Sequence, residues 1–252
     1  MPDTQDRHRG AVFQVSIPLE WDDLDDCYIV DGIKFSKIVN MIGFFEVFGR
    51  RDYEFSGLND AIFVDIGANI ADSALFAASN DKVKQVYAYE PFPDVYKMAE
   101  QNIGLNPELK DKIKLYPYGW FNKNMSLVTG EIDDINLSAL NTVVPEFAEV
   151  RKPDKVHQAT IELKKSSDLL REIINSHPDN PIVLKMDIEG AEYICMNELD
   201  KSGLLSKVSA LFIEWHLKGY TPITDILDKY GFVWFNEKLG SNVGFIRAVR
   251  KN

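Results

Sequence analysis

The chain is poor in cysteine and has no long apolar run. Only two cysteines, Cys27 and Cys195, occur in 252 residues, and no CxxC pair is present. A disulfide framework and a thiolate zinc site are therefore excluded. Cys195 falls on the apolar side of an expected helix, which predicts a buried free thiol. No apolar stretch reaches the ~20 residues of a membrane helix, and residues 1–10 lack the apolar core of a signal peptide. We therefore expect a cytoplasmic protein without a membrane span.

The chain also has fewer basic than acidic residues. Lys and Arg total 28 against 39 Asp and Glu, which gives a formal net charge of −11. Binding to nucleic acid draws on an excess of Lys and Arg, so no nucleic-acid partner is expected. A neutral or cationic ligand fits this balance better. Histidine is scarce as well, and of the four in the chain only His216 falls at the carboxyl end of an expected strand.

From residue 60 onward, apolar segments typical of strands alternate with segments of helical spacing. The expected strands cover residues 61–66, 85–90, 113–120, 160–167, 182–187 and 209–216, followed by a hairpin of 232–236 and 243–249 around Leu239, Gly240 and Ser241. Helices lie between the strands, and the one at 167–174 is expected to be capped by Ser166 or Ser167. This alternation predicts an α/β fold with a doubly wound, mostly parallel sheet and one antiparallel terminal strand.

The chain divides into two expected parts. Residues 1–57 are rich in aromatic and acidic clusters and predict an N-terminal cap of low regularity, in which residues 41–49 form a helix over the main domain. Residues 58–252 carry the alternating pattern and form the main domain. Residues 121–158 show little pattern, and we expect the acceptor to reach the site across them. The aromatic N-terminal segment also suits an interface between two copies of the chain.

Polar residues follow the first two strands of the main domain. Asp65 ends the first strand and is followed by Gly67 and Asn69, and Glu90 ends the second strand. A glycine in such a turn lets a ligand approach the backbone. An acidic residue at the end of the second strand binds ribose hydroxyls in nucleotide-binding α/β folds. The pattern therefore predicts a site for a cofactor that contains a ribose.

Two cofactor classes compete for this site. A dinucleotide favours the spacing G-x-G-x-x-G, because its pyrophosphate presses on the turn. Here Asn69 stands at the second glycine position and Asp72 at the third. An acid at the start of the helix repels a pyrophosphate, whereas S-adenosylmethionine has no phosphate and carries a sulfonium and an ammonium group. Spacing and charge therefore favour S-adenosylmethionine over a dinucleotide.

Four segments together resemble a known family. They are VDIGANIADSALFAA (64–78), YAYEPFPDVYKMAEQNI (87–103), LKMDIEGAEY (184–193) and FIEWH (212–216). Across about residues 60–218 the chain resembles the FkbM-type methyltransferases, and the DIEGAEY element is the most specific part. The resemblance implies a class I, Rossmann-like fold with a seven-stranded sheet. It also implies an S-adenosylmethionine-dependent O-methyltransferase that acts on a hydroxyl of a carbohydrate or other small natural product.

The resemblance also implies which residues contact the cofactor. They are Asp65, Gly67, Ala68 and Asn69 at the methionine part, Glu90 at the ribose, and Pro91 and Phe92 at the adenosine. The chain departs from the family pattern at Ala71, where a glycine is usual, and we expect this change to narrow the turn only.

Charged residues also follow the two strands beside the cofactor. An acceptor hydroxyl needs a base to take its proton, and Asp187, Glu189 and His216 are the candidates. The near-neutral reference pKa of histidine suits this role. Lys185 lies two residues before Asp187, so a catalytic role and an ion pair with a carboxylate are open alternatives. Glu192 begins the next helix, where the helix dipole alone favours an acid.

Three further alternatives stay open. Asp187, Glu189, Glu214 and His216 offer oxygen and nitrogen ligands for a divalent ion, but their spacing is no known metal motif, so a site without a metal is favoured. The aromatic residues that either stack on a sugar or pack in the core are Trp120, Phe121, Trp215 and Tyr220. A nucleotide-dependent oxidoreductase or sugar-modifying enzyme and a non-catalytic partner subunit are the competing functions.

Overall fold

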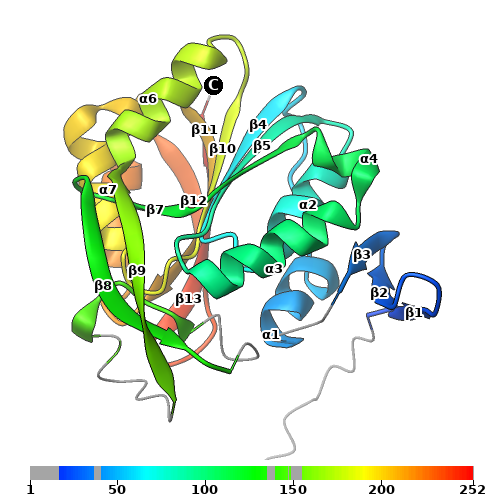
Figure 1. The fold of residues 1–252 in the computed structure, drawn as a ribbon. Coiled ribbons are helices and arrows are strands. Elements are labelled where there is room, and N and C mark those ends of the chain that lie inside the picture. Colours follow the sequence, from blue (N-terminus) through cyan, green and yellow to red (C-terminus); the bar gives the residue numbers. More distant parts are fainter. Residues whose placement is uncertain (1–16, 37–40, 135–139, 147, 149–154, 252) are drawn as a thin grey trace, which may run out of the picture.

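A seven-stranded sheet forms the centre of the molecule in the computed structural model, which describes residues 17–36, 41–134, 140–146, 148 and 155–251 (Figure 1). In order across the sheet, the strands are β12 (Phe232–Lys238), β13 (Val243–Arg250), β11 (Val208–His216), β10 (Ile182–Met186), β4 (Ala61–Ile66), β5 (Val83–Tyr89) and β6 (Ile113–Tyr116). From β11 to β6 all pairs are parallel, and β13 runs antiparallel to both β11 and β12. The predicted α/β class, parallel sheet and antiparallel terminal strand are confirmed.

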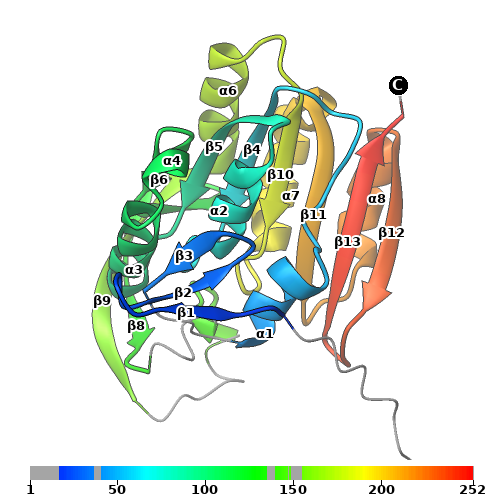
Figure 2. The same cartoon turned by 90° about the vertical axis from the view of Figure 1, so that its right-hand side faces the viewer.

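Helices cover both faces of this sheet (Figures 1 and 2). On one face lie α2 (Asp72–Ser79), α3 (Pro93–Gly104) and α4 (Pro107–Lys110), and on the other lie α6 (Ser166–Ser176), α7 (Glu192–Ser202), the 3-10 turn η3 (Leu204–Lys207) and α8 (Thr221–Lys229). All six residues of β4 are buried, because a parallel strand between two helical layers needs apolar side chains on both sides. Phe63 packs in the core with α2, and its neighbour Val64 packs in the core with α6 and α7.

The residues before the main sheet form a short antiparallel sheet and a helical segment. The elements are β1 (Glu20–Asp22), β2 (Cys27–Val30), β3 (Ile33–Phe35), α1 (Met41–Phe44) and the π-helix η1 (Phe45–Gly49). The helix expected at 41–49 is present, but this part is more regular than the sequence predicts. The ring of Phe48 meets Phe35 of β3 and Phe76 of α2 edge to face, each at 5.7 Å. These aromatic contacts fix the segment to the helical layer over the sheet.

A second three-stranded sheet stands beside the main one. It consists of β7 (Tyr118–Phe121), β9 (Val156–Lys165) and β8 (Met125–Ile132), with β9 in the middle. The expectation of little structure at 121–158 is therefore wrong for the described parts, because β8 lies within it and forms a long antiparallel pair with residues 156–163 of β9 (Figure 1). Side chains along most of β8 alternate between half-buried and exposed. The strand therefore lacks the continuous apolar run that marks a buried strand in a sequence.

Two local predictions about the helices have different outcomes. Cys195 on α7 is a buried free thiol, as predicted. The helix expected at 167–174 begins at Ser166, but its N-cap is Lys165 and no side chain caps it. The prediction of a cap by Ser166 or Ser167 is wrong, because both serines lie inside the helix and Ser167 Oγ donates to Glu198 on α7 at 2.8 Å. Among the described residues, no helix is long and apolar enough to cross a membrane.

Candidate active site

A cavity of about 720 Å³ lies at the carboxyl ends of β4, β5, β10 and β11. Open α/β sheets bind their ligands at this edge. The predicted residues that line it are Gly67, Asn69, Glu90, Pro91, Phe92, Lys185, Asp187, Glu189, Glu214 and His216. Asp65 and Ala68 are fully buried and do not contribute to the lining. The structure thus brings the predicted cofactor half and the predicted acceptor half to one cavity.

The turn after β4 approaches the turn after β10 so closely that it needs a glycine. Gly67 has a φ of 87°, and a Cβ at this position would lie 1.9 Å from the carbonyl oxygen of Asp187. Asn69 and Ala71 are also left-handed, with φ of 47° and 67°. The sequence predicts only that Ala71 narrows the turn. The structure shows in addition that its backbone is left-handed, which costs a residue other than glycine ~1–2 kcal/mol of conformational free energy. Backbone strain of this kind gathers at ligand sites.

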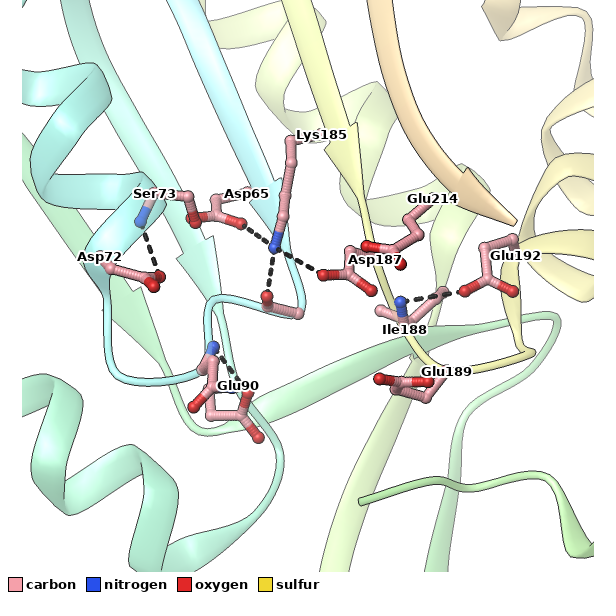
Figure 3. A network of polar contacts seen from close by, with 12 residues as sticks. Asp65, Asp72, Ser73, Glu90, Lys185, Asp187, Ile188, Glu189, Glu192 and Glu214 are labelled. Carbon is pink, nitrogen blue, oxygen red and sulfur yellow. Dashed lines mark hydrogen bonds and ion pairs between the residues drawn. The ribbon is translucent and has the colours of Figure 1, made fainter. Parts of the chain in front are cut away.

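Glu90 links this turn to the start of α3. Its Oε2 accepts a hydrogen bond from the backbone N–H of Asn69 at 3.0 Å (Figure 3). Its Oε1 accepts one from the backbone N–H of Phe92, also at 3.0 Å. Burial raises the pKa of Glu90 to about 8, although the two amides oppose the shift. The two amides fix the Glu90 carboxyl group in place at the cavity wall, and each of its oxygens keeps a lone pair for a ligand hydroxyl.

Lys185 is the centre of a buried ionic group (Figure 3). Its Nζ lies 3.0 Å from Asp65 Oδ1 and 4.0 Å from Asp187 Oδ2, and it donates a hydrogen bond to the carbonyl oxygen of Gly67. Ser73 Oγ donates to the other oxygen of Asp65 at 2.6 Å. Burial opposes the charge of Lys185, but the surrounding carboxylates outweigh it and hold the pKa of Lys185 above its usual value. Of the two open alternatives for Lys185, the structure shows the ion pair.

His216 lies among carboxylates on both of its ring nitrogens. Nδ1 is 3.1 Å from Glu192 Oε1, and Nε2 is 3.2 Å from Glu189 Oε2 and 3.6 Å from Glu214 Oε1. Burial favours the neutral ring, but the hydrogen bond to Glu192 and the charges of Glu189, Glu192 and Asp187 outweigh it and raise the pKa of His216 to about 10. The ring is then a cation at neutral pH, so a carboxylate is the better candidate for the base.

Glu192 stabilises the conformation of the turn between β10 and α7. Its Oε1 accepts hydrogen bonds from the backbone N–H groups of Ile188 and Gly190, both at 3.1 Å. Between them, Glu189 has a left-handed φ of 54°, and its carbonyl accepts a hydrogen bond from Thr142 Oγ1 at 2.7 Å. The helix dipole alone does not account for Glu192, because the side chain is fully buried and its contacts are specific.

Several residues that line the cavity were not among the predicted site residues, and the ionisable ones include Glu46, Tyr53 and Asp72. Glu46 belongs to η1, and π-helical turns often occur at functional sites. Burial, together with the charges of Asp187 and Asp52, raises the pKa of Glu46 to about 7, and burial raises that of Asp72 to about 6. One signal in the sequence could have pointed to Glu46, since it is the only charge in MIGFFEVFG. No comparable signal marks Tyr53.

The four aromatic candidates have different positions. Trp120 is buried and lines the cavity. Trp215 is also buried, but its Nε1 donates to Asn236 Oδ1 at 2.6 Å and its ring is not part of the lining. Phe121 and Tyr220 do not line the cavity either. Of the four, Trp120 is the one placed to contact a ligand there.

Comparison with known proteins identifies the family. Residues 65–234, about two thirds of the chain, match the model of the methyltransferase FkbM domain. The chain belongs to the FkbM methyltransferase family. Methyltransferase sdnD of Sordaria araneosa is 28% identical over 217 residues, covering 78% of this chain and 83% of that protein. This FkbM protein is therefore an S-adenosylmethionine-dependent methyltransferase, and the predicted family and enzyme class are confirmed. The competing oxidoreductase and non-catalytic subunit are set aside.

Two solved structures are similar to this chain at low sequence identity. The FkbM methyltransferase of Methylobacillus flagellatus is 16% identical with a TM-score of 0.48, and the match covers 77% of this chain and 45% of that chain. This chain therefore spans less than half the length of that protein. Sp1610 of Streptococcus pneumoniae, solved with S-adenosyl-L-methionine, is 15% identical with a TM-score of 0.45, covering 77% of this chain and 68% of that chain.

Proposed function

We propose that this FkbM protein transfers a methyl group from S-adenosylmethionine to a hydroxyl of a carbohydrate or another small hydroxylated molecule. The observation that supports this most is the shared cavity. It has the anchored carboxylate of Glu90 at one end and the carboxylates of Asp187 and Glu214 at the other. A hydroxyl is a poor nucleophile and needs a proton acceptor during attack, and the acidic lining of the cavity, which also includes Glu46, offers one.

The residues at the Glu90 end fit the cofactor. Glu90 is held by two backbone amides, so its free lone pairs are positioned for ribose hydroxyls. We assign Pro91 and Phe92, which line the same part of the cavity, to the adenosine. When bound, S-adenosylmethionine supplies an electrophilic methyl group on a sulfonium cation. Carboxylates such as Asp72 and Asp187 in the lining make the cavity favourable for that positive charge.

Lys185 and Asp65 act as positioning residues in this proposal. Lys185 bonds to the carbonyl of Gly67 and pairs with Asp65, so it holds the turn after β4 against the end of β10. The same ammonium group lies 4.0 Å from Asp187 and orients that carboxylate toward the acceptor half. Since its pKa is raised, Lys185 stays protonated and takes no part in proton transfer.

We assign the proton acceptor to Glu46. Glu46 lines the same cavity as Asp187 and Glu214. A general base is most effective when its pKa lies near the working pH, and burial together with the charges of Asp187 and Asp52 raises the pKa of Glu46 to about 7. Glu214 is less suited, because burial and the charge of Asp187 raise its pKa well above the usual value. Cationic His216 compensates the charge of the neighbouring carboxylates. We propose that residues 1–57 form a cap on a main domain of residues 58–252, and that Glu46 is the residue by which the cap takes part in the reaction.

The acceptor half also offers a group of possible metal ligands. Ligand atoms of Asp187, Glu214 and His216 lie within 4.8 Å of one another. Cationic side chains of the protein already lie beside these carboxylates. Lys185 Nζ is 4.0 Å from Asp187 Oδ2, and His216, whose pKa is raised to about 10, has its Nε2 3.6 Å from Glu214 Oε1. Cation and carboxylates already compensate one another, so we propose methyl transfer without a metal at this position.

Transfer of a labelled methyl group tests the proposal. The purified chain is incubated with methyl-labelled S-adenosylmethionine and a panel of hydroxylated sugars and small natural products, and the products are analysed for the labelled atom. We expect label on an oxygen of one acceptor class. Asp187→Asn should lower turnover while cofactor binding, measured by calorimetry, persists. The matched control is Glu108→Gln on the exposed surface of α4, which should leave both unchanged.

The position of the label decides the outcome. Label on a nitrogen or carbon atom would contradict the hydroxyl acceptor but leave the enzyme class intact. Cofactor binding that is unaffected by Glu90→Ala would contradict the assignment of the ribose site.

A further inference from the structure

We propose that Asp94, Glu131 and His157 form a binding site for a divalent transition-metal ion such as Zn²⁺, away from the cavity. Their ligand atoms lie within 4.8 Å of one another. Asp94 lies in the first turn of α3, Glu131 on β8 and His157 on β9. An ion held there connects the β8–β9 pair to α3. A mixed set of one imidazole and two carboxylates suits ions of the zinc type.

The distances within this group fit an ion better than direct hydrogen bonds. His157 and Glu131 are direct cross-strand partners. Nε2 of His157 lies 3.4 Å from Glu131 Oε2 and 3.8 Å from Asp94 Oδ2. Both distances exceed the ~2.7–3.2 Å of an ordinary N–H···O hydrogen bond. Two ligands at ~2.0–2.1 Å from a tetrahedral Zn²⁺ lie about 3.3–3.4 Å apart, which matches the shorter distance.

Glu131 supplies an oxygen that needs a partner. Its side chain is 1% exposed, and its Oε1 accepts a hydrogen bond from the backbone N–H of Asp94 at 2.9 Å. Oε2 is buried, and no hydrogen bond from the described residues reaches it. An unsatisfied oxygen of a buried carboxylate is unfavourable, and a bound cation between Glu131 and His157 would satisfy it.

Asp133 orients the ring of His157 for this role. Nδ1 of His157 lies 2.8 Å from Asp133 Oδ1. When Nδ1 carries the proton, Nε2 presents its lone pair to Glu131 and Asp94. Metal-binding histidines usually donate their second ring N–H to a carboxylate or carbonyl in this way. The side chain of His157 is 44% exposed, so an ion and a coordinating water can reach the site from solvent.

The site lies on the outside of a wall that also borders the cavity. Phe92 and Val95 at the start of α3 pack against Ile161 and Leu163 of β9 in one apolar cluster. Phe92 and Leu163 line the cavity. An ion that joins Asp94 to His157 therefore adds a second link between α3 and β9. This link would stabilise the wall of the cavity that the two elements form. The alternative is a protonated His157 that pairs with the three carboxylates and binds no metal.

Metal titration of the full chain tests the proposal. The protein is stripped with a chelator, and Zn²⁺ binding is measured by calorimetry, with Co²⁺ as a spectroscopic probe of the coordination geometry. We expect one Zn²⁺ per chain, a higher midpoint of thermal unfolding with Zn²⁺, and a Co²⁺ spectrum of a four-coordinate site with nitrogen and oxygen ligands. His157→Gln should abolish these effects. Asp133→Asn should weaken Zn²⁺ binding about 10- to 100-fold, the usual effect of removing a partner that orients a ligand.

Two further variants show where an ion binds. The matched control is His177→Gln, which changes a histidine that bonds to Tyr87 and should leave Zn²⁺ binding intact. Equal Zn²⁺ affinity of the wild type and His157→Gln would overturn the proposal. So would binding that persists in His157→Gln and is lost in His216→Gln, because the ion would then occupy the cavity. These readouts do not involve methyl transfer, so they stand apart from the proposed function.

Discussion

Lys185 and Asp65 form a buried ion pair across two neighbouring strands, with 3.0 Å between Nζ and Oδ1. The two residues are in register on β10 and β4. Their side chains are 4% and 0% exposed, so water does not screen the pair. Through the carbonyl of Gly67, the same ammonium group also holds the turn after β4, where we propose that the cofactor binds.

Removing one partner of this pair should destabilise the protein strongly. Lys185→Met leaves the charge of Asp65 buried without compensation, and we expect a loss of about 3–5 kcal/mol in the free energy of unfolding, measured by urea denaturation. The double variant with Asp65→Asn should lose less than the sum of the two single variants. Strict additivity would show that the pair is not coupled. Lys229→Met is the control, because it breaks an exposed pair with Asp200 and should cost at most ~1 kcal/mol.

His216 should remain protonated across the neutral range. Its pKa of about 10 in the folded protein exceeds the ~6.5 of an unfolded histidine. Its contribution to stability is therefore fully present below pH ~6.5 and is lost as pH rises from ~6.5 to ~10. NMR titration should show no change of His216 between pH 6 and 8. His177, whose pKa burial lowers, is the internal reference and should titrate below ~6.5. Glu192→Gln should lower the pKa of His216, and a wild-type transition near pH 6.5 would contradict the prediction.

Gly67→Ala should disrupt the cavity. The added Cβ would lie 1.9 Å from the carbonyl oxygen of Asp187, and the φ of 87° disfavours any residue with a Cβ. We expect a lower unfolding midpoint and the loss of measurable cofactor binding in calorimetry. Gly104→Ala is the matched control, because nothing lies within 4 Å of its Cβ position. It should be neutral or raise stability by ~0.4–1 kcal/mol. Normal cofactor affinity in Gly67→Ala would show that the turn tolerates displacement.

Glu90→Gln should weaken cofactor binding more than it weakens the fold. Glutamine keeps one acceptor oxygen, so it cannot accept from Asn69 and Phe92 through two oxygens as the carboxylate does. Leaving a buried hydrogen-bonding group without its partner costs ~1–3 kcal/mol, which corresponds to a rise of roughly 5- to 150-fold in the dissociation constant of S-adenosylmethionine. Calorimetry measures this change. A rise below about threefold would argue against a ribose contact.

Glu46→Gln should remove the proton acceptor. A base with a pKa of about 7 must be ionised to act, so wild-type turnover should increase as pH rises through 7. The variant should lose this dependence, and its kcat should fall about 10²- to 10⁴-fold. Glu54→Gln changes a nearby exposed carboxylate and is the control. An unchanged kcat in Glu46→Gln would contradict this assignment and indicate that Asp187 or Glu214 is the base.

The order of the elements is largely determined by the sequence. The strand at 61–66 is predicted to its exact ends, because β4 lies between two parallel strands and both of its faces need apolar side chains. The sequence does not predict strand β8. Most of its side chains are half-buried or exposed, so the segment lacks the apolar run by which β4 is found. Residues such as Glu90 and Asp187 were predicted from their place at strand ends, because parallel strands direct those ends to the same edge of the sheet.

Contacts between distant segments were decided by the tertiary structure alone. The sequence shows that Lys185 and His216 are ionisable, but their pKa values depend on which carboxylates the fold places beside them, Asp65 for one and Glu192 for the other. Glu46 reaches the cavity only because aromatic packing fixes the N-terminal segment against α2. Periodicity along the chain records which side chains are buried, whereas electrostatic interactions depend on distances in space, and these exist only after the chain has folded.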